Sequence, residues 1–107
     1  MNIKDNFFVS LLGVCLLALP ATAQTADVSF QDNGTSAVLT MTNETGRECS
    51  LTFSIEYYGR LINSAPPRWY EKARGTWTLL AGNERSEEFY ENDATTWRQH
   101  ILAEHCS

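Results

Sequence analysis

The strongest pattern along the chain is a strict alternation of apolar and polar residues from Cys49 to Tyr58. The apolar positions of this run are Cys49, Leu51, Phe53, Ile55 and Tyr57. A period of two over a run of this length predicts a β-strand that buries one face and exposes the other. We therefore expect this strand to be central to the fold.

A second alternating run precedes it, with Ala37, Leu39 and Met41 at the apolar positions. The two runs are joined by the polar stretch 43–47, in which Gly46 can adopt a positive φ. This combination predicts that the two strands form an antiparallel hairpin.

Shorter strands are predicted on both sides of this hairpin. Residues 26–30 alternate in the same way and end at a turn sequence, 31–34. Residues 76–80 form another candidate strand, which a turn at 81–83 closes, and residues 87–91 continue the pattern after that turn.

The C-terminal segment 95–106 fits either a helix or a strand. Asp93 could cap a helix. A strand would place Trp97 and Ile101 on one face and Cys106 on the other. We favour the strand, because a last strand beside the central one brings the cysteines of both within bonding reach.

The predicted fold is all-β: a small immunoglobulin-like β-sandwich of six or seven strands with one disulfide. A single helical turn over 66–74 is the one expected departure, since Pro67 suits its start and Gly75 its end. No internal repeat, linker or second domain is visible, so residues 24–107 are expected to form one β-sandwich domain.

The first 23 residues have the character of a secretory signal peptide. After Lys4 comes an almost wholly apolar run, 7–19, and then an A-x-A cleavage site at 21–23. The run is shorter than the roughly 20 residues that span a bilayer. Lipoprotein processing at Cys15 is the alternative, although Val14 is bulky where such signals carry a small residue. We predict a periplasmic or secreted protein, with no stable membrane insertion after cleavage.

Signal cleavage leaves two cysteines, Cys49 and Cys106. In an oxidising compartment an isolated pair has one intramolecular connectivity, so we predict a disulfide between them. Closing a loop of this length is worth roughly 4 kcal/mol in the chain-entropy model. For so small a core, this is a large part of the expected stability.

The chain has 8 basic and 13 acidic residues, a formal net charge of -5. This charge argues against nucleic acid as a partner, because phosphate binding requires a basic face. The charges are also unevenly distributed: residues 60–74 carry net positive charge, and residues 84–93 carry net negative charge. We therefore expect a strongly dipolar molecule.

The basic segment 60–74 combines cations with aromatic residues beside two prolines. Its candidate binding residues are Arg60, Arg68, Trp69, Tyr70, Lys72 and Arg74. Because Arg and large aromatic residues dominate protein-binding hot spots, one interpretation is a proline-stiffened interaction loop. In the other interpretation, Trp69 folds back to close the open end of the sandwich.

No catalytic motif, metal site or cofactor site is predicted. His100 and His105 are five residues apart, so their side chains cannot easily bind the same metal ion. His100 and Glu104 would share a strand face, but a metal needs three or four ligands. No G-x-S-x-G turn is present, and the predicted disulfide removes the cysteines as nucleophiles. We expect a protein without enzymatic activity.

The leading functional prediction is a periplasmic or secreted protein-binding module, an accessory or assembly factor that contacts another exported protein. In size, export and strand order it is similar to the small periplasmic immunoglobulin-like proteins that restrain amyloid fibre subunits during curli assembly, a similarity of layout without a shared motif. An enzyme inhibitor or immunity protein is an alternative, with the acidic run 84–93 as a mimic of an anionic substrate. A carbohydrate-binding module built on Trp69, Tyr70 and Trp77 is the other.

The signal-peptide prediction is tested by the mass of the exported protein. Because the A-x-A site follows an apolar run of signal length, the mature chain should begin at Gln24 or within two residues of it. Intact-mass analysis measures this directly. Recovery of a chain that keeps Met1 outside the cytoplasm would exclude the cleavage.

Overall fold

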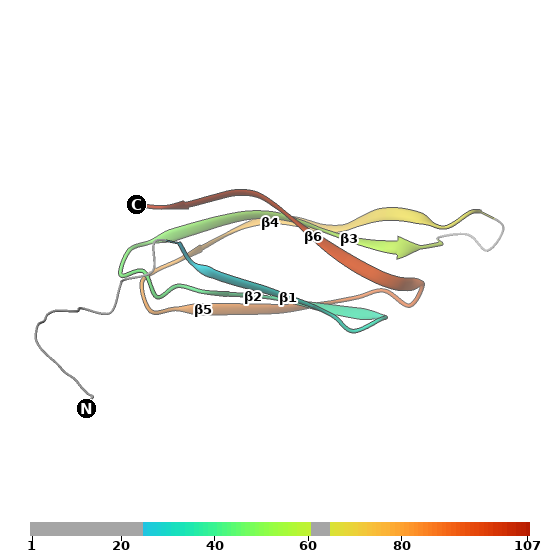
Figure 1. Cartoon of the computed structure of the whole chain (residues 1–107), viewed down its shortest axis with the longest axis horizontal. Coiled ribbons are helices and arrows are strands. Elements are labelled where there is room, and N and C mark those ends of the chain that lie inside the picture. The colour runs from blue at the N-terminus through green and yellow to red at the C-terminus, as the bar shows by residue number, and fades with distance from the viewer. Residues whose placement is uncertain (1–24, 61–64) are drawn as a thin grey trace, which may run out of the picture.

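The computed structural model describes residues 25–60 and 65–107, which form six strands in two layers (Figure 1). The strands are β1 (Asp27–Asp32), β2 (Ser36–Thr42), β3 (Cys49–Gly59), β4 (Arg68–Leu79), β5 (Glu84–Tyr90) and β6 (Ala94–Cys106). Within these residues, no helix is long and apolar enough to cross a membrane. The predicted signal peptide, residues 1–23, lies outside them.

The strands form two antiparallel sheets of three strands, in the orders β1-β2-β5 and β4-β3-β6. Figure 1 shows the β4-β3-β6 sheet lying over the β1-β2-β5 sheet. The apolar side chains of both sheets are buried between them. The fold is therefore the predicted small β-sandwich, with six strands, while a specific likeness to immunoglobulin domains stays a prediction.

The inner face of β3 forms the middle of the core. Its inward side chains, from Cys49 to Tyr57, are at most 4% exposed. From the opposite sheet, Leu39 and Met41 complete the same cluster with no exposed surface. Burying one such side chain contributes about 1.5–3 kcal/mol. The apolar positions of this alternating run are thus the side chains that form most of the core.

β2 and β3 do not form the predicted hairpin. β2 pairs with β1 and β5, whereas β3 pairs with β4 and β6, so the two strands lie in opposite sheets. Both strands have one strongly apolar face. By crossing from one sheet to the other, the chain packs these two faces against each other, which side-by-side pairing would not do.

The crossing turn is organised by Asn43, which is fully buried. Its Nδ2 donates to the carbonyl oxygens of Arg47 (2.6 Å) and Leu79 (3.0 Å). Its Oδ1 accepts from the backbone N–H (3.1 Å) and the hydroxyl (2.7 Å) of Thr45. Because a buried amide must have its donors and acceptors satisfied, these bonds hold the turn against the end of β4.

β4 begins at Arg68, well before the predicted strand at 76–80, and the helical turn predicted over 66–74 does not form. β3 continues to Gly59, and pairing with β4 satisfies its backbone along its full length. In the β3–β4 ladder, Ile55 lies opposite Ala73 and Glu56 lies opposite Glu71. Lys72, between them, has no partner in β3 and forms a bulge. This bulge interrupts the alternation, which hid the strand in the sequence.

The segment after Asp93 is a strand, as favoured from the sequence, and it lies beside β3. Cys49 lies directly opposite Cys106 in the ladder, and the predicted disulfide joins them. The bridge therefore fastens the first residue of β3 to the last residue of β6.

A second bulge, at Leu102, changes the faces of β6. Ile101 lies opposite Phe53, and Ala103 lies opposite the preceding residue of β3, so Leu102 is the additional residue. As a result, Cys106 lies on the inner face together with Trp97 and not on the opposite face as predicted. For the same reason His100 and Glu104 lie on opposite faces.

Removal of the disulfide is expected to destabilise this domain strongly. Replacing both Cys49 and Cys106 with Ala should lower the free energy of unfolding by about 2–5 kcal/mol, because the unfolded chain regains the entropy of an open loop. Denaturant unfolding of the oxidised protein and the double variant measures the difference. Equal denaturation midpoints for the two proteins would show that the bridge does not contribute to the free energy of unfolding.

Candidate functional site

The structure separates the candidate binding residues by the faces of β4. Trp69 points to the outer face of the β4-β3-β6 sheet, where it meets Tyr58 of β3. Tyr70 points inward and stacks on Tyr57, with ring centroids 5.6 Å apart. Arg68 lies over the Tyr70 ring, 4.7 Å from its centroid. The basic segment is therefore not one loop surface, because most of it is a strand with two faces.

On the outer face, Trp69 is the centre of a cluster that we call the Trp69 platform. It consists of Tyr58, Trp69 and Arg98, with Glu56 and His100 beside them. The Tyr58 ring meets the Trp69 ring edge-on at 5.4 Å, and the Arg98 guanidinium lies 4.0 Å from the Trp69 centroid. A cation at this distance over an indole is attracted by about 0.5–1 kcal/mol at exposed sites.

Glu56 fixes the position of the platform's cation. Its Oε1 accepts from Nε of Arg98 at 2.6 Å and lies 2.9 Å from Nε2 of His100. Hydrogen bonds from Arg98 and then His100 lower the pKa of the Glu56 carboxyl below its ordinary value. The carboxylate thus stays ionised and holds Arg98 over the indole ring.

A second carboxylate, Glu71, lies directly opposite Glu56 across the β3–β4 pair. Its Oε2 accepts from Ser54 at 3.0 Å and from Nε of Arg74 at 2.6 Å. Like charges directly opposite each other destabilise a sheet. Here each carboxylate has its own cation, which keeps both negative charges compatible with the pairing.

Trp69 is half-buried and does not close the end of the sandwich. That end is filled from the inner face by Tyr57, which contacts both Tyr70 and Trp97 with ring centroids 5.6 Å away. The second interpretation of Trp69 from the sequence is therefore wrong. Its indole is held on the surface of the sheet instead.

The basic and acidic segments lie along the same flank of the sandwich. β4 and β5 are edge strands of the two sheets, and Lys72 meets Glu91 at 3.4 Å. Arg85, which belongs to the acidic run, lies over the Trp77 ring, 4.6 Å from its centroid. The charges that were expected to make the molecule strongly dipolar therefore partly neutralise each other.

A clasp formed by Asp32 sets the start of β6 and hence the position of Arg98. Oδ2 of Asp32 accepts from the Thr96 hydroxyl (2.6 Å) and from the Trp97 N–H (3.0 Å). Oδ1 accepts from the Gly34 N–H (2.9 Å), and the Trp97 indole N–H donates to the Gly34 carbonyl (2.7 Å). The β1–β2 turn is thereby joined to the other sheet next to the platform.

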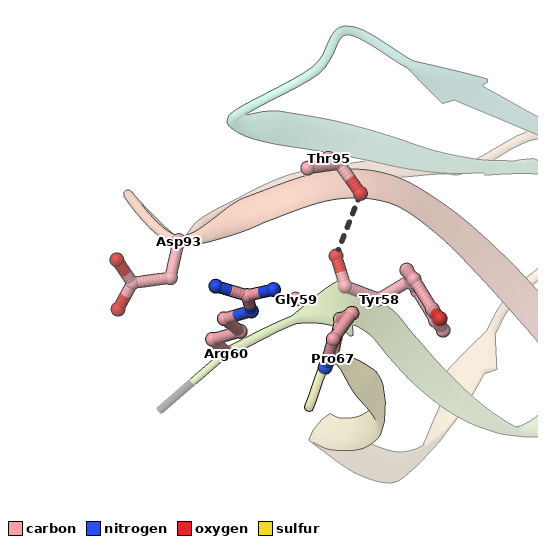
Figure 2. A pocket seen from close by; sticks show the side chains of 6 residues that line it. All are labelled: Tyr58, Gly59, Arg60, Pro67, Asp93 and Thr95. Carbon is pink, nitrogen blue, oxygen red and sulfur yellow. Dashed lines mark hydrogen bonds between the residues drawn. The ribbon is translucent and has the colours of Figure 1, made fainter. Parts of the chain in front are cut away.

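An open pocket of about 370 Å³ lies where β3 ends and β6 begins (Figure 2). It is lined by Tyr58, Gly59, Arg60, Pro67, Asp93 and Thr95. The Thr95 hydroxyl donates to the Tyr58 carbonyl at 3.1 Å, so it is already engaged. A Cβ on Gly59 would overlap the Asp93 carbonyl oxygen, which shows how closely the strands approach there. The pocket's open shape and mixed charge suit a partner's side chain.

The described residues contain no cluster of three or more His, Cys, Asp or Glu that could hold a metal ion. His100 is engaged with Glu56, and the cysteines form the disulfide. The three residues considered for a carbohydrate platform do not share a surface: Trp69 is on the outer face, Tyr70 on the inner face, and Trp77 is 3% exposed.

Sequence reasoning missed most of the platform. Of its members, only Trp69 was a candidate binding residue. His100 was considered only as a metal ligand, and Tyr58, Glu56 and Arg98 were not candidates. One signal was present, because Tyr58 is a large aromatic at a position where the alternation predicts exposure. The contribution of β6 had no local signal, since it depends on which strands become neighbours.

A comparison of the chain with known protein families, curated proteins and solved structures finds no match.

The Asp32 clasp predicts a pH-dependent contribution to stability. Burial alone would raise the pKa of Asp32, but hydrogen bonds from Thr96, Gly34 and Trp97 outweigh it and lower the pKa. A carboxyl whose pKa is lower when folded stabilises the protein above the unfolded value of about 3.9, and this contribution is lost as the pH falls through the folded value.

The substitution Asp32→Asn should therefore lower the free energy of unfolding by about 1–2 kcal/mol at neutral pH, because it removes charged hydrogen bonds. The difference from the unmodified protein should shrink as the pH falls below about 4. Denaturant unfolding at several pH values measures it. A difference that stays constant down to acid pH would contradict the clasp.

Proposed function

We propose that this chain is an exported, non-enzymatic protein-binding module that acts as an accessory or assembly factor in the periplasm or outside the cell. Its binding surface is the Trp69 platform together with the neighbouring open pocket. The partner is another exported protein. Nucleic acid and a lipid bilayer are not expected as partners.

The observation that carries this proposal is the state of Trp69. A large indole lies half-buried on the outer face of a sheet, where the core does not require it, and is fixed by Tyr58 and Arg98. Trp, Tyr and Arg are the residues that most often dominate binding energies in protein interfaces. Because these side chains are already ordered, a partner would lose little additional entropy in binding them.

The disulfide supports the proposed location. A single bridge between the ends of two paired strands is typical of small exported domains and is rarely maintained in a reducing cytosol. It agrees with the signal peptide that the sequence predicts.

The geometry favours a protein partner over the two alternatives. A sugar platform would need rings side by side, and Trp77 is buried in the core. An inhibitor that mimics an anionic substrate would need a concentrated negative surface, whereas Lys72 and Arg85 lie among the acidic residues of the β4/β5 flank.

Binding through the platform is tested with matched aromatic variants. The disulfide-bonded protein is immobilised and exposed to the extracytoplasmic fraction of its host, and the affinity of each retained protein is then measured in purified form. Trp69→Ala should weaken the specific complex at least about tenfold, because it removes a hot-spot ring. Tyr90→Ala is the control, since Tyr90 is an exposed aromatic residue of the other sheet, 62% exposed.

Two results would contradict the proposal. A retained protein that binds the Trp69→Ala variant as tightly as the unmodified protein would remove the platform from the interface. Glycan binding without any specific protein partner would favour the carbohydrate alternative. Thermal unfolding of each variant shows that a loss of binding does not reflect a loss of the fold.

A further inference from the structure

β6 is an unusual edge strand, because it exposes apolar side chains. The two sheets have four edges, formed by β1, β5, β4 and β6. Ile101 is 41% exposed and Leu102 is 49% exposed, and both lie in β6. Exposed apolar side chains beside unpaired backbone groups favour the addition of another strand.

β6 is also the one described edge without net formal charge, counting His as neutral. The charged residues of the edges are Asp27 and Asp32 in β1, Glu84, Arg85, Glu87 and Glu88 in β5, Arg68, Glu71, Lys72 and Arg74 in β4, and Arg98 and Glu104 in β6. β1 and β5 are therefore negative and β4 is positive. Each of these three edges repels its own copy, whereas β6 does not.

The Asp32 clasp defines where the free part of β6 begins. The Trp97 N–H donates to Asp32, so it points away from β3. Because backbone groups alternate along a strand, those of Gln99 and Ile101 also point away from β3. The free edge thus runs from the clasp to the strand end at Cys106, and its midpoint falls between Ile101 and Leu102.

The bulge at Leu102 makes this edge self-complementary. Before the bulge, His100 faces outward and Gln99 inward, and after it His105 faces outward and Glu104 inward. Residues that lie opposite each other in an antiparallel pair must share a face. Without the bulge, Gln99 and Glu104 would face opposite sides, but with it they share the inner face.

We propose that β6 is a self-association edge, which pairs antiparallel with β6 of a second copy about a twofold axis between Ile101 and Leu102. In this register Ile101 lies opposite the second copy's Leu102, and Gln99 lies opposite its Glu104. The two β4-β3-β6 sheets then form one continuous sheet of six strands.

Several features favour a second copy over a different protein as the occupant. The net charge of -5 opposes self-association in general, so a neutral edge is where two copies can approach. In this register Ile101 of each copy packs against Leu102 of the other, so both exposed apolar pairs become buried. The register also places the side-chain amide of Gln99, which can donate, opposite the second copy's Glu104 carboxylate, which accepts.

The dimer goes beyond the proposed function and does not depend on it. The twofold axis runs perpendicular to the sheet, so both outer faces point the same way. Two Trp69 platforms would then face one side of the assembly. Such an arrangement could engage a repetitive partner at two points.

Sedimentation equilibrium of the disulfide-bonded protein, from about 1 µM to about 1 mM, tests the proposal. We expect a reversible monomer–dimer equilibrium. Leu102→Lys should weaken the dimer at least about tenfold, because it places two cations near the axis and removes apolar burial. Leu80→Lys is the matched control, since Leu80 lies outside β6 and is 62% exposed; it should leave the dissociation constant unchanged.

Exposed His105 gives a second test that does not disturb the fold and that checks the register. His105 lies opposite the second copy's Arg98, so His105→Glu creates two ion pairs in each dimer. It should tighten the dimer about threefold or more, although it makes each copy more negative. His105→Arg should loosen the dimer by a similar factor.

A chain that stays monomeric over the whole range would overturn the proposal and leave β6 available to a different partner. If Leu102→Lys does not weaken the dimer, the two copies associate through a surface other than β6, and the proposal is wrong. A dimer that responds to Leu102→Lys while His105→Glu weakens it would overturn the register.

Discussion

The structure depends on burying the inner face of β3. This face is apolar along the whole strand, and its side chains are the middle of the buried cluster. β2 covers it from the opposite sheet, while β4 and β6 extend along both of its sides. The crossing of the chain at Asn43 and the disulfide at the first position of β3 follow from the same requirement.

Of the three register shifts along β3, those at Lys72 and Leu102 decide which side chains reach each surface. Lys72 is displaced from the β3–β4 ladder toward Glu91, and Glu71 comes to lie on the outer face beside Glu56. Leu102 separates His100 from Glu104 and brings Cys106 to the inner face, where it can bond to Cys49. A regular β6 ladder would place Cys106 on the wrong face for the bridge.

The candidate functions draw on regular strands and not on loops. The Trp69 platform combines residues of β3, β4 and β6, and the proposed dimer edge belongs to β6 alone. Side chains on a well-paired sheet are held by their neighbours, so they can present a fixed surface to a partner. Arg98 connects the two regions, because it lies over Trp69 and close to the free edge.

The sequence by itself determined the fold class, the strand from Cys49 to Tyr58 and the disulfide pair, and it favoured a strand over a helix at 95–106. Those features follow from local alternation and from there being one possible pairing of the exported cysteines. Tertiary structure alone decided that β2 and β3 separate into different sheets and that β4 begins at Arg68. It also decided that Arg98 lies over Trp69. Alternation specifies which side of a strand is buried but not which strand becomes its neighbour, and a bulge reverses the faces without a local signal.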